Sequence, residues 1–148
     1  MTSGNTVRID FHSSLGMLDF VQMVSDYVSR TVGLDEDSVH WVNVAVRESV
    51  INAIKHGNCN DVHKRVHVEF TSLQDSGGSG VAILVRDEGC GFDPAALPNP
   101  LAPENLLKAN GRGIFLMRSF MDEMSFERGE HGGMQVRMVK RVSQSTLA

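Results

Sequence analysis

Three separated segments carry residue types that suit one phosphate-bearing ligand. The first runs from Glu48 to Gly57 and places a carboxylate four residues before the amide of Asn52. That spacing puts both side chains on one face of a helix. The Asn52 oxygen suits Mg²⁺, a hard cation that prefers oxygen ligands. Glu48 could reach the same metal through water, or accept a proton from an attacking hydroxyl.

The helix that carries Glu48 and Asn52 is predicted over 39–56 and is apolar nearly all round, which indicates that it is mostly buried. An unpaired buried carboxylate is costly, so Glu48 requires a partner. The ordinary explanation is an ion pair with Lys55 and a hydrogen bond from Asn52 to the backbone. This segment alone does not separate the two explanations, but the other two segments favour a ligand.

The second segment begins with Asp87, directly after the apolar run 81–85 and Arg86. Gly89 and Gly91 follow, and glycines let a backbone turn and approach a flat ligand closely. A carboxylate only accepts hydrogen bonds, so Asp87 could select the exocyclic amine of adenine and repel the keto oxygen of guanine.

The third segment is Gly111-Arg112-Gly113, which precedes an apolar helix that starts at Ile114. Backbone N–H groups and the dipole at a helix N-terminus can hold phosphate. Arg112 and the nearby Lys108 would neutralise its charge. The sequence contains no Walker-type Gly-Lys-Ser/Thr, so the common P-loop is excluded. A metal-chelated nucleotide is the simplest ligand that needs all three segments.

The elements that position these segments can be read from hydrophobic periodicity. Alternation predicts strands near 7–11 and 66–70, a continuous apolar run predicts a buried strand over 81–85, and a final hairpin is expected from 126 to 142. Helical spacing predicts helices over 15–28, 39–56 and 114–124. All four prolines fall in a loop over 93–110, and a loop of this length is usually either functional, such as a lid, or disordered. The expected fold is an α+β two-layer sandwich in which three helices cover one face of a mixed, mostly antiparallel sheet.

The composition is that of one globular domain spanning 1–148, with a polar tail over 143–148. A net charge of −4 and scattered basic residues argue against a nucleic-acid binder. We expect no signal peptide and no membrane span, because no apolar run is long enough. The two cysteines, Cys59 and Cys90, are expected to be free thiols in a reducing cytoplasm.

Taken together, Glu-x-x-x-Asn-x-x-Lys-His-Gly from Glu48, Asp-x-Gly-x-Gly from Asp87 and Gly-x-Gly from Gly111 resemble the Bergerat ATP-binding fold, shared by DNA gyrase, Hsp90 chaperones, histidine kinases and MutL. The short length, the ending His56-Gly57 and the stretch that starts at Gly113 look most like bacterial anti-sigma-factor serine kinases. The resemblance extends from about residue 7 to 141.

The resemblance implies ATP and Mg²⁺ as cofactors, with a lid over 92–110. It makes Glu48 the general base and Asn52 the Mg²⁺ ligand. The remaining nucleotide-site residues that it implies are Lys55, His56, Asp87, Gly89, Gly91, Phe92, Lys108, Gly111, Arg112, Gly113 and Ile114. The implied partners are an anti-anti-sigma protein of the STAS fold, which is phosphorylated on serine, a sigma factor, and a second copy of the chain. Met134 stands where the family often has Thr or Ser, which questions contacts from the last strand.

Two other functions fit parts of the sequence. A non-catalytic module that binds ATP and sequesters a protein partner would need the same pocket. A zinc site built from His56, Cys59, His63 and His67 is disfavoured because zinc ligands usually come in tighter pairs.

Overall fold

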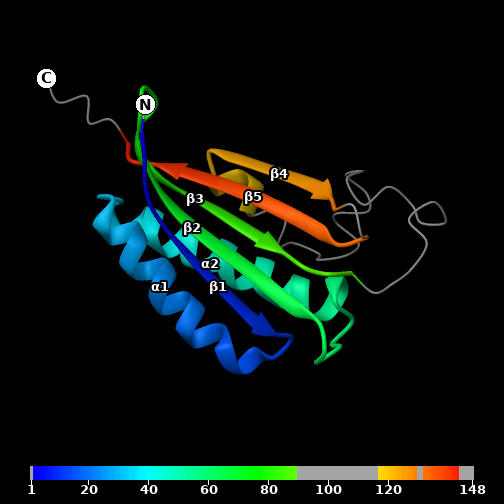
Figure 1. Cartoon of the computed structure of the whole chain (residues 1–148). Helices are drawn as coiled ribbons and strands as arrows, with labels where there is room; N and C mark the ends of the chain where they lie inside the picture. The colour runs from blue at the N-terminus through cyan, green and yellow to red at the C-terminus, as the bar shows by residue number, and fades with distance from the viewer. Residues whose placement is uncertain (1, 90–116, 130–131, 144–148) are drawn as a thin grey trace, which may run out of the picture.

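The computed structural model describes residues 2–89, 117–129 and 132–143. These residues form one open sheet whose strand order is β1-β2-β3-β5-β4 (Figure 1). Its strands are β1 (Thr2–His12), β2 (Arg65–Asp75), β3 (Gly78–Arg86), β4 (Glu123–Arg128) and β5 (Met134–Arg141). The helical elements are η1 (Leu15–Met17), α1 (Leu18–Thr31), α2 (Glu36–Asn52) and the π-helical turn η2 (Ala53–Gly57).

Every described strand pairing is antiparallel, so the prediction of a mixed sheet is wrong in this respect. The reason is visible between β1 and β2. Two helices, α1 and α2, connect these strands, and each reverses the direction of the chain. The chain therefore returns antiparallel to β1, whereas a single crossover helix would have returned it parallel.

Both long helices cover the same face of the sheet (Figure 1). Alternate residues of the strands point toward them, and their burial explains the period of two in the sequence. The fully buried core residues include Val42, Val46 and Val50 from α2, together with Val68 and Ile83 from the sheet. The helix predicted over 39–56 begins earlier, at Glu36, because the Asp35 side chain caps it by accepting a hydrogen bond from the Ser38 N–H at 2.8 Å.

The opposite sheet face carries charged side chains. Arg8 pairs with Glu69 at 3.2 Å across β1 and β2. His67 lies between two carboxylates, with Nδ1 2.7 Å from Asp10 and Nε2 3.2 Å from Glu88. A polar outer face and a helix-covered inner face make the two-layer sandwich that the sequence predicts.

The helix predicted over 114–124 ends earlier than expected. Residues 117–120 are helical, and β4 begins at Glu123. The Asp122 N–H donates to the Val139 carbonyl at 2.9 Å, so pairing with β5 has already replaced the helical bonds. Met117 and Met121 are buried from the helical side, while Met124 lies opposite Met138 on the sheet. Met117, Met121 and Met124 have the spacing of one helix face, so periodicity alone extends the predicted helix beyond its end at residue 120.

Candidate functional site

Glu48 and Asn52 lie on one stripe of α2, beside the face that packs on the sheet. Both are half-buried, and Ala45 on the same stripe is 1% exposed. Within the described part of the chain, neither side chain has a hydrogen bond or ion pair, and Lys55 forms no ion pair with Glu48. Among the described residues, the ordinary explanation of Glu48 as half of an ion pair with Lys55 is therefore not supported.

The end of this helical segment brings Gly57 against Asp87. A Cβ atom added to Gly57 would lie 2.0 Å from Asp87 Oδ2 and 2.2 Å from its Cγ. Such separations do not occur between real atoms, so only glycine fits at this position while Asp87 keeps its place. The first and second segments of the sequence therefore meet in the structure.

Asp87 is 7% exposed and held by backbone groups. Its Oδ1 accepts hydrogen bonds from the N–H groups of Gly89 and Met134, each at 3.0 Å. Its Oδ2 accepts none from the described residues. Burial raises the pKa of the Asp87 carboxyl, and the two N–H donors and Lys64 oppose that rise. One oxygen is thus fixed, and the other remains an acceptor for an N–H donor.

The turn after Asp87 is built around glycine. Gly89 adopts a positive φ of 81°, and a Cβ there would lie 2.7 Å from the Gly132 carbonyl oxygen. A Cβ at Gly133 would lie 2.2 Å from the Asp87 carbonyl oxygen. The glycine turn that the sequence predicts at Gly89 is therefore confirmed, and its close neighbour here is the backbone of Gly132.

Sequence reasoning missed two groups in this turn. The Met134 backbone bonds to Asp87 twice: its N–H donates to Asp87 Oδ1 and its carbonyl accepts from the Asp87 N–H, each at 3.0 Å. Asn58 is fully buried and bonds to the backbone N–H groups of Glu88 and Gly89. The signal for Asn58 was available, since an amide directly after a helix end is well placed to bond to neighbouring backbone.

The helical residues 117–120, which follow the third segment in the chain, pack on α2. The ring of Phe120 stacks on Trp41 with centroids 3.7 Å apart and planes 3° from parallel. Ser49 Oγ donates to Met117 Sδ at 3.7 Å. Trp41 belongs to the same stripe of α2 as Glu48 and Asn52. The remaining predicted site residues, with most of the lid, lie outside the described residues: Gly91, Phe92, Lys108, Gly111, Arg112, Gly113 and Ile114.

Other predicted residues of the first segment are solvent-facing. Lys55 and His56 are exposed. The expectation of free thiols is wrong for Cys59, which is disulfide-bonded, and the only other cysteine, Cys90, lies outside the described residues. Among the residues that the structure describes, no three His, Cys, Asp or Glu side chains gather as a metal would require.

A profile of the histidine kinase-like ATPase domain matches residues 16–140. The chain belongs to this family. An anti-sigma F factor of Oceanobacillus iheyensis is 34% identical over 113 residues, which covers 74% of this chain and 73% of the relative. The anti-sigma F factor of Bacillus subtilis is 33% identical with the same coverage. The serine-protein kinase RsbW of Bacillus subtilis is 27% identical over 126 residues, covering 81% of this chain and 75% of the relative.

A member of the histidine kinase-like ATPase family uses ATP, and the described residues fit that ligand. Asp87 offers a buried carboxylate oxygen, which suits the exocyclic amine of adenine. Glu48 and Asn52 offer half-buried oxygen atoms that have no partner in the described residues, which suits a metal-bound phosphate. Gly57 brings these two groups of candidate residues together by letting the helix end against Asp87.

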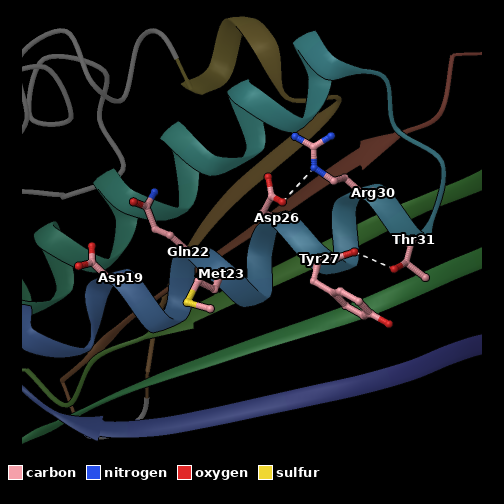
Figure 2. A pocket seen from close by; sticks show the side chains of 7 residues that line it. All are labelled: Asp19, Gln22, Met23, Asp26, Tyr27, Arg30 and Thr31. Carbon is pink, nitrogen blue, oxygen red and sulfur yellow. Dashed lines mark hydrogen bonds and ion pairs between the residues drawn. The ribbon is translucent and has the colours of Figure 1, made fainter.

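A separate hollow lies on α1, which carries none of these candidate residues. Figure 2 shows that the side chains along it come from one helix. Arg30 pairs there with Asp26 at 2.9 Å. The residues lining the hollow are Asp19, Gln22, Met23, Asp26, Tyr27, Arg30 and Thr31. None of the helices in the described ranges is long and apolar enough to cross a membrane.

Proposed function

We propose that this protein is a serine protein kinase that transfers the γ-phosphoryl group of ATP to a serine of a STAS-type anti-anti-sigma protein. In this proposal it also acts as an anti-sigma factor that switches between partners in the cytoplasm. The observation that carries the proposal is the contact between Gly57 and Asp87. It joins a buried acceptor suited to adenine to the helix that bears Glu48 and Asn52. Relatives named serine-protein kinase and anti-sigma F factor support the same assignment.

In the proposed site, Asp87 accepts a hydrogen bond from the adenine amine through Oδ2, while Gly89 and Met134 hold Oδ1. This arrangement disfavours guanine, because a keto oxygen there would face a carboxylate oxygen. Gly91, Phe92 and Ile114 would line the same pocket, and Lys55 and His56 would complete the end of the helix.

Glu48 is proposed to accept the proton of the attacking serine hydroxyl. The serine oxygen forms the new bond to the γ-phosphorus as the bond to the β-phosphate oxygen breaks, and ADP leaves. Asn52 would hold Mg²⁺ through its amide oxygen, and the metal would neutralise charge on the phosphates. Gly111, Arg112, Gly113 and Lys108 are proposed to bind the phosphates through backbone N–H groups and positive charge.

Replacing Glu48 with Gln tests the assignment of the base. Gln keeps the size of the side chain but cannot accept the proton, so phosphoryl transfer should fall by about 10²–10⁴-fold. ATP binding, measured by calorimetry with Mg²⁺, should stay close to wild type. Labelled ATP and a purified STAS-type partner report transfer. A variant that phosphorylates the partner at the wild-type rate would exclude Glu48 as the base.

An exposed apolar stripe on α1 favours a second candidate, a non-catalytic module that binds ATP and sequesters a protein. Phe20, Met23 and Tyr27 are spaced three and four residues apart and are 49%, 68% and 72% exposed. Exposed apolar residues in a row on one helix commonly mark a protein interface. The two functions differ in one result: the module binds its partner without transferring label to it.

The stripe can be tested separately from catalysis. Met23→Glu should weaken partner binding without changing ATP affinity, because α1 carries none of the proposed ATP-site residues. Val62→Glu is a matched control, since Val62 is an exposed apolar residue outside the stripe. Equal binding by both variants would remove α1 from the interface. Sedimentation of the purified chain tests the further proposal that it is a homodimer.

A further inference from the structure

Asn58 is a fully buried amide at the point where three parts of the chain meet. It directly follows η2, and its own N–H donates to the Ala53 carbonyl at 2.8 Å. Its side chain reaches the residues after β1, the start of β2 and the turn after β3. A buried amide at such a junction can fix the relative positions of all three.

The Asn58 side chain uses its whole hydrogen-bonding capacity. Nδ2 donates to Ser13 Oγ and to the Arg65 carbonyl, each at 2.9 Å. Oδ1 accepts from the Glu88 N–H at 2.8 Å and from the Gly89 N–H at 3.2 Å. Two donors and two lone pairs are all that a primary amide offers. Because both ends are occupied, the amide cannot rotate without breaking bonds at both ends.

One of these bonds is shared with Asp87. The Gly89 N–H lies 3.0 Å from Asp87 Oδ1 and 3.2 Å from Asn58 Oδ1, so one hydrogen serves both oxygens. Lys64 Nζ donates to the carbonyl of the same Gly89. Asn58 therefore shares the Gly89 N–H, which is one of the two backbone donors that hold Asp87 Oδ1.

We propose that Asn58 is a positioning residue for nucleotide selection: it orients the turn after β3 so that Asp87 presents Oδ2 to adenine. The proposal rests on the proposed function of Asp87. Asn58 itself touches no nucleotide in this arrangement, and it acts through Gly89 and Glu88. Without it the turn would gain freedom, Asp87 would rotate, and discrimination between an amine and a keto oxygen would weaken.

Asn58→Ser and Asn58→Asp are the test variants. Ser is too short to span the junction. Asp retains an acceptor for the Glu88 and Gly89 N–H groups but loses both donations, and it adds a negative charge beside Asp87. Both variants should lower the ratio of ATP to GTP affinity at least tenfold, and Ser should lower it more. The kcat at saturating ATP should stay within about twofold of wild type, because Glu48 lies on α2 and Asn58 lies after η2, at the turn that follows β3.

Asn43→Ser is the matched control. Asn43 is also a bonded amide between elements, since it accepts from Ser25 Oγ at 2.8 Å and donates to Asp26 Oδ1 at 3.2 Å. It lies between α1 and α2, away from the turn. This control should lose stability in urea yet keep the nucleotide preference. This control therefore distinguishes the effect of losing a structural amide from a specific loss of the preference for ATP over GTP.

Calorimetry of the full chain with MgATP and MgGTP decides between the outcomes. If wild type prefers ATP and the Asn58 variants lose that preference while Asn43→Ser keeps it, the proposal holds. If the Asn58 variants lose stability but keep the preference, Asn58 is structural only and the proposal fails alone. If wild type binds neither nucleotide, or both equally, the assignment of Asp87 fails and takes the proposal with it. If Ser prevents folding, the Asp variant decides by the same criterion.

Discussion

Replacing Gly57 with Ala tests the contact on which the ATP site depends. Gly57 lies in a helical turn and is not among the glycines with a positive φ, so its backbone would accept Ala. In the absence of a contact, Gly-to-Ala would stabilise the fold by about 0.4–1 kcal/mol, because the unfolded chain becomes less free. The structure predicts the opposite sign, since the new Cβ would lie 2.0 Å from Asp87 Oδ2.

The magnitude follows from what must move. Forcing an extra methyl group into a packed site costs about 1–3 kcal/mol. If Asp87 turns away instead, it loses its bonds from Gly89 and Met134, each contributing about 1 kcal/mol. After the stabilisation from the less flexible unfolded chain is subtracted, we expect Gly57→Ala to lower the free energy of unfolding by about 1–2 kcal/mol. A domain near this size would then unfold about 2–8 °C lower.

Urea unfolding and ATP calorimetry measure the two consequences together. Gly57→Ala should be less stable and should bind ATP more weakly. In an Asp87→Gly background the same change should cost almost nothing, because the clashing atoms are gone. Gly16→Ala is the control, since its new Cβ would meet only the flexible Ser14 Oγ at 3.3 Å. A Gly57→Ala protein that is as stable as wild type, or more so, would refute the contact and the joined site.

Three further predictions concern the surroundings of the site. Phe120→Leu should lower the free energy of unfolding by about 0.5–1.5 kcal/mol, because the stack on Trp41 is lost. It should also shift the fluorescence emission of Trp41, the single tryptophan of the chain, and an unchanged spectrum would contradict the stack. The Arg141 guanidinium, with the Gly77 N–H, lowers the pKa of the Asp75 carboxyl in the folded protein. The ionised Asp75 side chain therefore stabilises the fold above the pKa of the unfolded chain, near 3.9. This stabilisation is lost as the pH falls through the folded-state pKa. Urea midpoints of wild type should therefore fall toward those of Asp75→Asn on acidification. Burial raises the pKa of the Asp87 carboxyl in the folded protein. The contribution of Asp87 to the free energy of unfolding is therefore full below the pKa of the unfolded chain, and it is lost as the pH rises through the folded-state pKa. Wild type should then gain stability relative to Asp87→Asn as the pH falls, and a parallel pair of curves would contradict the burial.

Local patterns were enough to predict most of the elements and where several candidate residues lie on them. The alternation in β1 and β2, the helix spacing of Glu48 and Asn52, and the position of Asp87 after a buried strand follow from short-range periodicity. Each of these depends on residues only a few positions apart. The fold class and the glycine turn at Gly89 were predictable for the same reason.

Contacts between distant residues were decided by the tertiary structure alone. Gly57 meets Asp87, Met134 binds Asp87 through its backbone, and Asn58 joins Ser13, Arg65 and the turn after β3. The antiparallel order of the sheet and the early end of the helix at 120 belong to the same class. No periodicity encodes them, because they arise only when two helices return the chain to the sheet and β5 pairs with β3. A sequence can name a carboxylate that is suited to select a base, but packing decides which of its two oxygens is already bonded to the backbone.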